Sequence, residues 1–283
     1  MDNNIEIKLR RARPADREKL IWVESKSTPN LSYVPFVFDK FVADEEGEFS
    51  VAEIDDEIVG CGKFTVLPDG SAWLETLRVI PERQGLGVGK RFYERFYDNA
   101  RRLGVKTMRM YTGVKNVVSK GLAERYDLEL AERFRGVRMS SENCTPSDID
   151  FIEVTDIEKA NELISYHSDN WGGFLVMNRT FYKISSELVS YLVKNGMVYS
   201  DPETESVIVV GARFMPWKQL HIGLYGGEAS GCLAFAMNKG LARGVETLNC
   251  LFPSSSSSTE EILLESGFEL EPSDFIVMET NLE

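Results

Sequence analysis

Three glycines at alternate positions, Gly85, Gly87 and Gly89, are followed by the basic pair Lys90 and Arg91. Glycine has no side chain, so a ligand can come close to the backbone at these positions. The neighbouring cations add positive charge. Residues of these types at this spacing are suited to bind a phosphate or a pyrophosphate through backbone amides.

The elements on either side would position these amides. Residues 77–80 form a largely apolar run that Pro81 ends, because proline cannot donate to a sheet ladder. Phe92, Phe96 and Ala100 recur at helical spacing after the glycines. We therefore predict a strand, a glycine-rich turn and a helix, with the free N–H groups and the positive dipole end of the helix at the turn.

Two better-known phosphate-binding motifs do not fit this stretch. A P-loop needs a glycine where Gln84 stands and a Ser or Thr where Arg91 stands. A dinucleotide fingerprint, G-x-G-x-x-G counted from Gly85, would end at Lys90 instead of a glycine. Neither motif therefore describes this stretch.

The stretch resembles the acyl-coenzyme A motif of the GNAT superfamily of N-acetyltransferases. The resemblance rests on Q-x-x-G-x-G at residues 84–89 and on L-R-V-x-P at residues 77–81. It implies that acetyl-coenzyme A, the only cosubstrate expected, places its pyrophosphate on the turn and its pantetheine along the strand. The cofactor-binding residues so implied are Leu77, Arg78, Val79, Gln84, Gly85, Leu86, Gly87, Val88, Gly89, Lys90 and Asn116.

The same resemblance supplies a candidate general base, Glu75. Several members that acetylate small molecules or polyamines have a similar L-E-x-L-x-V arrangement before the turn. Strand alternation would put Glu75, Leu77 and Val79 on one face, with the Val79 amide polarising the thioester carbonyl. Glu75 would take the ammonium proton directly or through water. The alternative for Glu75 is a carboxylate that only binds substrate or caps a sheet edge.

The family's usual general acid is a tyrosine on the helix after the fifth strand, and Ala123 stands in its place. Tyr126 and Tyr111 are the candidate substitutes, and solvent is a third source of the proton because a thiolate leaves readily near neutral pH. The expected activity is direct acetyl transfer to a primary amine of a small molecule or peptide. The alternative is an acyl-coenzyme A-binding regulatory or scaffold protein without turnover.

Composition places the chain among ordinary folded proteins. It has 283 residues, of which 43% are apolar and 27% charged. No run of about 18 apolar residues predicts a membrane span, and residues 1–16 lack the apolar core of a signal peptide. Four scattered cysteines, without a C-x-x-C pair, favour thiols over disulfides or a metal site. We expect a cytoplasmic protein that binds no metal and no membrane.

Charge is distributed unevenly between the halves. Acidic and basic residues balance in residues 1–145, so the net charge of −13 lies in the remainder. An acidic surface repels nucleic acid and attracts a cationic substrate or partner. The alternative is a solvated acidic surface with no partner. Trp171 and Trp217 are expected to help form an acceptor cleft.

The second half repeats the first at an offset of 140 residues. Residues 100–108 fall on residues 240–248, and residues 127–130 fall on residues 267–270. We predict an α/β fold, of the mixed-sheet α+β kind, made of two tandem GNAT-like acyl-coenzyme A N-acyltransferase domains from a duplication. The predicted domains are residues 1–140, which bind acetyl-coenzyme A, and residues 150–283, a degenerate copy. Residues 141–149 are the predicted linker.

The copies differ where the phosphate would bind. At the same offset the glutamine becomes Leu224, the glycines become Gly227 and Ala229, and Glu228 enters the turn. A carboxylate facing a pyrophosphate weakens binding. We infer that only the first copy binds coenzyme A; the alternative is that Glu228 points away and both copies bind.

Overall fold

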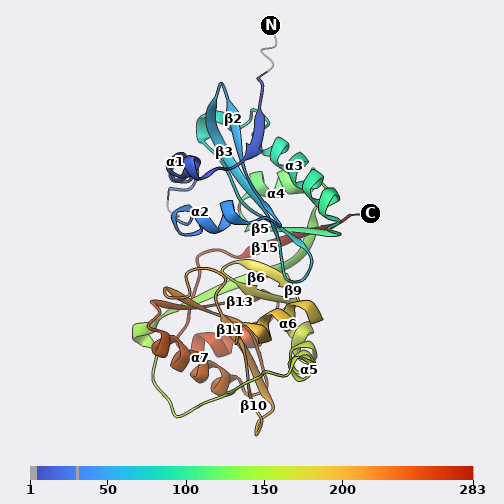
Figure 1. Cartoon of the computed structure of the whole chain (residues 1–283). Helices are drawn as coiled ribbons and strands as arrows, with labels where there is room; N and C mark the ends of the chain where they lie inside the picture. Colours follow the sequence, from blue (N-terminus) through green and yellow to red (C-terminus); the bar gives the residue numbers. More distant parts are fainter. Residues whose placement is uncertain (1–4, 30–31, 283) are drawn as a thin grey trace. The chain divides into compact units, whose positions relative to one another are not determined.

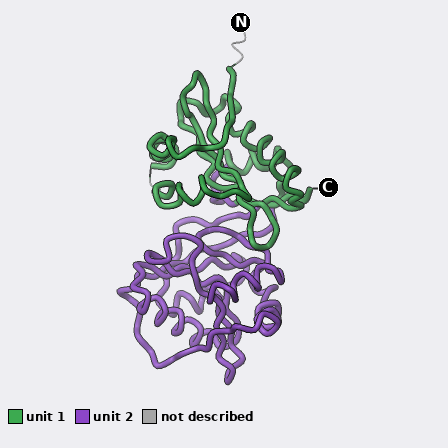
Figure 2. The backbone as a smooth tube through the Cα atoms, viewed as in Figure 1, with its two compact units in different colours: residues 1–110, 118–129, 279–283 green, residues 111–117, 130–278 purple. Residues whose placement is uncertain are grey.

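The computed structural model describes residues 5–29 and 32–282. The chain divides into two compact units (Figure 2). Unit 1 comprises residues 1–110, 118–129 and 279–283, and unit 2 comprises residues 111–117 and 130–278. No helix among the described residues is both long and apolar enough to cross a membrane.

Unit 1 is built on a sheet in the order β1-β2-β3-β4-β5, in which only the β4–β5 pair is parallel. The strands are β1 (Lys8–Arg11), β2 (Glu48–Ile54), β3 (Glu57–Val66), β4 (Ala72–Val79) and β5 (Thr107–Gly113). The α-helices are α1 (Arg17–Ser27), α2 (Val34–Ala43), α3 (Val88–Leu103) and α4 (Val117–Glu124). Figure 1 shows α1 and α2 on one side of the sheet and α3 on the other.

Local sequence accounts for the main connections of unit 1. The β2–β3 hairpin turns at Asp55 and Asp56, whose φ angles of 52° and 62° are those of a tight two-residue hairpin turn. Gly104 ends α3 in the left-handed conformation, with φ +67°. Glycine adopts this conformation without strain because it has no Cβ atom. The phenylalanines predicted on one face of this helix, Phe92 and Phe96, are buried.

In unit 2 the strand order is β15-β6-β13-β12-β11-β10-β7, with β14 beside β6. Its strands are β6 (Glu129–Ser140), β7 (Ile152–Glu153), β10 (Val198–Asp201), β11 (Ser206–Gly211), β12 (Gln219–Gly226), β13 (Thr247–Pro253), β14 (Glu269–Leu270) and β15 (Phe275–Asn281). A separate hairpin joins β8 (Phe174–Met177) and β9 (Thr180–Lys183). The α-helices are α5 (Ile157–His167), α6 (Ser186–Lys194), α7 (Ala229–Arg243) and α8 (Ser257–Glu265).

The predicted repeat is confirmed by the element bounds. β5 and β13 begin at Thr107 and Thr247, and the helices before them end at the left-handed glycines Gly104 and Gly244. A helix follows each strand, α4 after β5 and α8 after β13. The match fails before the first helix of each pair, because Leu224 lies inside β12 rather than in a turn.

The compact units overlap the predicted domains, but their boundaries differ. The unit boundary falls within β6, so that residues 130–140 belong to unit 2, and residues 279–283 belong to unit 1. The predicted linker, residues 141–149, begins with a 3-10 turn, Ser141–Asn143. The domain division at residues 140 and 150 stays a prediction.

Candidate functional site

β4 contains a bulge at Thr76. Cys61 of β3 lies opposite Arg78, whereas Lys63 lies opposite Glu75, so β4 has one residue more than β3 between these pairs. Thr76 has a φ of +57°, a left-handed value that is uncommon for a β-branched residue. An extra residue of this kind reverses the in–out alternation of the side chains that follow it.

The bulge corrects the predicted face of Glu75. Directly opposite residues of an antiparallel pair share a face, so Glu75 and Arg78 share one face of β4. Val79 lies on the other face, opposite Gly60, where an added Cβ would contact Phe92 of α3. The prediction that alternation puts Glu75 and Val79 on one face is wrong, because the bulge separates them.

Glu75 lies on the side of the sheet that α1 and α2 cover. Its carboxylate is 9% exposed by residue and accepts a 2.6 Å hydrogen bond from the Thr65 hydroxyl. The Tyr33 hydroxyl, just before α2, is 3.5 Å from the other carboxylate oxygen. A buried carboxylate with two hydroxyl groups beside it can accept and pass on a proton.

The Val79 amide points to the free edge of β4. Hydrogen-bonded and open pairs alternate in an antiparallel ladder. The Ile80 amide donates to Val59 of β3 at 3.0 Å, so the N–H and C=O of Val79 point the other way. On that edge β4 pairs with β5 only at Ala72 and Trp73. The predicted backbone role of Val79 is therefore compatible with the strand geometry.

The turn after β4 carries a row of unused amides. A 3-10 turn, Pro81–Arg83, leads to Gln84, whose side-chain amide donates to the Val79 carbonyl at 3.0 Å. The amides of residues 85–90 donate to no acceptor in the described part of the chain, and α3 has no side-chain N-cap. These free N–H groups and the helix dipole make this turn an anion-binding geometry.

The three glycines of the turn are needed for different structural reasons. Gly85 and Gly87 have φ values of +77° and +90°, with nothing within 4 Å of an added Cβ. They are needed for the backbone conformation and leave the approach to the amides open. Gly89 lies inside α3, where a Cβ would come within 2.9 Å of Leu122 of α4. Its glycine lets the two helices pack closely.

The side chains of the two candidate tyrosines are engaged elsewhere. Tyr126 stacks on Tyr93, with ring centroids 4.8 Å apart, and donates its hydroxyl to the Lys90 carbonyl at 3.0 Å. Burial raises the pKa of Tyr126 above its ordinary value. Tyr111 belongs to unit 2, where its ring lies near Phe181. Ala123, at the family's tyrosine position, is fully buried.

Asn116 also belongs to unit 2, in the turn between β5 and α4. Its backbone amide donates to the Gly113 carbonyl at 2.9 Å. The glycine-rich turn belongs to unit 1. The position of Asn116 is therefore described only within unit 2. The predicted contact of Asn116 with the cofactor stays a prediction.

The corresponding helix of unit 2 is closed by its own carboxylate. Glu228 is the N-cap of α7 and accepts hydrogen bonds from the amides of Ser230 and Gly231, at 3.2 and 2.6 Å. The hydroxyl of Ser230 also donates to it, and these bonds hold the pKa of Glu228 below its usual range. β12 ends at Gly226, so a two-residue connection replaces the long turn of unit 1.

The edge of β12 is filled as well. β12 and β13 stop pairing after Ile222, and beyond that point the Tyr225 carbonyl accepts a 2.9 Å hydrogen bond from the indole of Trp171. A Cβ at Gly226 would overlap the ring of His167. Trp171 is 3% exposed and Trp217 is 64% exposed. The expected acceptor cleft with the first half stays a prediction.

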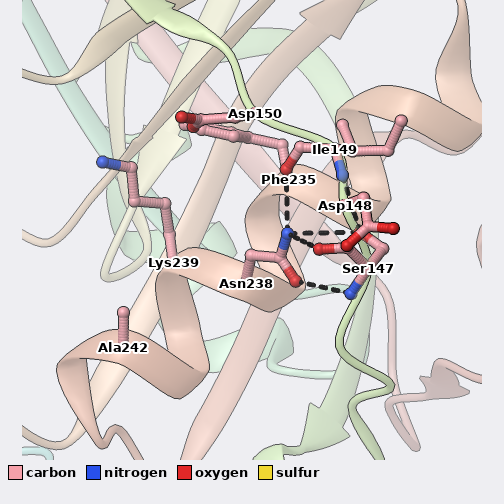
Figure 3. A pocket seen from close by; sticks show the side chains of 8 residues that line it. All are labelled: Ser147, Asp148, Ile149, Asp150, Phe235, Asn238, Lys239 and Ala242. Carbon is pink, nitrogen blue, oxygen red and sulfur yellow. Dashed lines mark hydrogen bonds between the residues drawn. The ribbon is translucent and has the colours of Figure 1, made fainter.

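A shallow pocket in unit 2 lies apart from the predicted site residues (Figure 3). Asn238 of α7 holds the segment after β6 there, with hydrogen bonds to the Ser147 backbone at 2.9 and 3.0 Å. Its side chain also donates to the Ile149 carbonyl. Asp148, Asp150 and Lys239 add charged groups to its lining. The pocket holds none of the predicted catalytic residues.

Comparison with known protein families identifies the first part of the chain. Residues 15–127 match the model of the acetyltransferase (GNAT) family. These residues are a GNAT domain. They include the turn at residues 84–90, Glu75 and all of α3. None of the curated protein sequences compared with the chain matches it.

Solved structures extend the likeness of fold to the whole chain. A GCN5-related N-acetyltransferase from Sphaerobacter thermophilus matches with a TM-score of 0.66 and 12% identity, over 99% of this chain and 96% of that one. A tandem GNAT protein from the clavulanic acid biosynthesis pathway matches with a TM-score of 0.60 and 12% identity, over 98% of both chains. A fungal glucosamine N-acetyltransferase region matches with a TM-score of 0.69 and 11% identity, over 98% of this chain and 38% of that one. The chain has the tandem GNAT fold.

Sequence reasoning missed the residues that surround Glu75. Thr65 and Tyr33 are ten and 42 positions away in the chain, and neither belongs to the motif. The sequence patterns single out neither residue, because a hydrogen bond between side chains of different elements leaves no local signal.

Proposed function

We propose that unit 1 is an acetyl-coenzyme A-dependent N-acetyltransferase that transfers acetyl directly to a primary amine of a small molecule or peptide. The observation that carries the proposal is the row of unused amides at residues 85–90, beside the free edge of β4. This arrangement fits a pyrophosphate at the start of α3 and an extended chain along β4. Bound acetyl-coenzyme A supplies the acetyl group.

In this proposal residues of unit 1 accept the proton, polarise the thioester carbonyl and hold the turn in place. Glu75 receives the proton of the acceptor ammonium, and Thr65 and Tyr33 orient its carboxylate. The amide of Val79 faces the edge where a thioester carbonyl would gain from a hydrogen bond. Gln84 fixes the turn to the end of β4 through the Val79 carbonyl. Proton supply to the leaving thiolate then comes from solvent, since the Tyr126 hydroxyl already donates to Lys90.

The strand–helix connection of unit 2 before α7 binds no second donor in this proposal. Glu228 occupies the amides that a pyrophosphate would need, and Trp171 occupies a backbone acceptor at the edge of β12. A second carboxylate or phosphate cannot share those amides without repulsion. One donor therefore binds per chain.

A second function, acyl-coenzyme A binding without turnover, is favoured by one observation. Ala123 replaces the usual acid, and the neighbouring tyrosine hydroxyl is already hydrogen-bonded. This function requires the same free amides but no base. The two proposals differ only in whether coenzyme A is released when amines are present.

The test is thiol release from acetyl-coenzyme A with a panel of primary amines. We expect release with at least one amine, and Glu75→Gln should lower kcat by about 10²- to 10⁴-fold with unchanged affinity for acetyl-coenzyme A. Glu142→Gln, at an exposed carboxylate of unit 2, is the matched control. Binding of acetyl-coenzyme A without release from any amine would favour the second function, and no binding at all would refute both.

A further inference from the structure

Arg78 of β4 has a guanidinium whose hydrogen-bonding capacity is largely unused. Its Nη1 donates to the neighbouring Leu77 carbonyl at 3.3 Å. Its Nε is buried and has no partner in the described part of the chain. A buried donor without an acceptor costs about 1–3 kcal/mol, more when the group is charged. Such a group is a candidate for an acceptor that arrives from outside.

The register of β4 brings this cation to the face of the proposed base. Arg78 lies opposite Cys61 and Glu75 lies opposite Lys63, two residues apart on β3. The two positions are therefore separated by about 7 Å along the strand. Burial raises the pKa of Cys61, and Arg78 and Glu24 of α1 are its charged neighbours. Arg78 and Glu75 both lie on the α1 and α2 side of the sheet.

The other charges on this face are already satisfied within the protein. The buried Glu24 carboxylate accepts hydrogen bonds from the amides of Tyr33 and Val34, at 3.0–3.1 Å, and so caps α2. The Lys63 ammonium is paired with Asp44. Among the described residues no carboxylate forms an ion pair with Arg78, so its charge remains available to a ligand.

We propose that Arg78 binds a carboxylate of the acceptor, which makes the substrate an amino acid or a peptide with a free carboxyl group near its amine. This inference rests on the proposed acetyl transfer and names its acceptor class. The planar guanidinium can hold a carboxylate through two parallel hydrogen bonds, which an ammonium cannot match. The amine of the same molecule then lies at Glu75. Arg78 acts here through its side chain, apart from the backbone role of β4.

The test compares amino acids with their decarboxylated amines. Tyrosine and tyramine, phenylalanine and phenethylamine, and lysine and cadaverine form matched pairs. We expect kcat/KM to be about 10- to 100-fold higher for the acid of at least one pair, the size of a hydrogen-bonded charge. Arg78→Gln should abolish this preference by lowering kcat/KM of the acid more than that of the amine, and Arg78→Lys should restore part of it.

Two controls make the result decisive. Arg101→Gln, at an exposed arginine near the end of α3, should leave every ratio unchanged. Calorimetry with N-acetyltyrosine and N-acetyltyramine measures the same preference in the products without turnover. Equal kcat/KM within all pairs, an equal loss for both members in Arg78→Gln, or equal affinity for the two products overturns the role of Arg78. Preference for an aminophosphonate over the amino acid would overturn the choice of carboxylate. Failure of every amine to release thiol refutes the proposed transfer instead.

Discussion

At the scale of single residues, glycine and histidine show how the same residue type serves different ends. Gly87 permits a left-handed turn at the start of α3, whereas Gly89 permits contact with Leu122 of α4. His221 lies in β12, 4% exposed, and His167 covers Gly226. Neither histidine lies in unit 1, where the proposed chemistry takes place.

His221 predicts a pH dependence of stability. Burial lowers its pKa to about 3, with a smaller contribution from Arg179. The unfolded chain therefore binds one proton more than the folded chain between pH 6.5 and about 3. The stabilisation from keeping His221 neutral is fully present above pH 6.5 and is lost on acidification, at about 1.4 kcal/mol per pH unit.

Denaturant unfolding at a series of pH values measures this slope. His221→Leu should reduce the slope below pH 6.5 by nearly one proton, whatever its effect on stability at neutral pH. His167→Leu should reduce it less, because the pKa of His167 is lowered by weaker burial. An unchanged slope in His221→Leu would show that this histidine is not buried in its neutral form.

At the scale of elements, the two copies of strand, connection and helix differ in how the first amides of the helix are satisfied. In unit 1 a 3-10 turn and two left-handed glycines precede α3, and its first amides stay free. In unit 2 the connection is short, and Glu228 caps α7. A helix N-terminus needs an acceptor in either case. The protein supplies that acceptor in α7, whereas in α3 the proposed ligand would supply it.

Replacing the cap of α7 tests this contrast. Glu228→Ala should lower the free energy of unfolding by about 1 kcal/mol, the usual cost of losing an N-cap. Calorimetry should still find one acetyl-coenzyme A per chain, in the wild type and in the variant, because the β12–α7 connection lacks the long turn. Glu158→Ala, at an exposed glutamate in the first turn of α5 that does not cap it, is the control. Two equivalents in the wild type would contradict the assignment of one site.

At the scale of the whole molecule, the end of the chain belongs to the first unit. Glu279 pairs with the buried Arg109 of β5, which also contacts Asp69 at 2.7 Å. The Leu282 amide donates to the Lys106 carbonyl at 2.7 Å. Residues 279–282 therefore help complete unit 1, although all of unit 2 precedes them in the sequence.

Removing residues 279–283 should therefore weaken unit 1. Arg109 would keep Asp69 but lose Glu279, and a buried charge that loses a partner costs about 1–3 kcal/mol. We expect a lower free energy of unfolding and weaker binding of acetyl-coenzyme A. Glu279→Gln should reproduce most of the loss in stability, and Asn281→Ala, at an exposed side chain, should not. Full acetyl-coenzyme A affinity and stability after the truncation would show that unit 1 is complete without this segment.

The sequence by itself predicted the turn, a phosphate-bearing ligand for it and the repeat of the fold. The spacing of glycines and apolar residues is a local pattern over a few positions, so it predicts the strand, the turn and the helix directly. The match at an offset of 140 residues predicts the second copy. Only the tertiary structure decided the face of Glu75. The bulge at Thr76 is visible only in the pairing of β4 with β3, and strict alternation along the sequence does not predict it. It also decided the partners of Glu75, the closure of α7 by Glu228 and the unit to which residues 279–283 belong. These depend on contacts between segments distant in the chain, which no local pattern specifies.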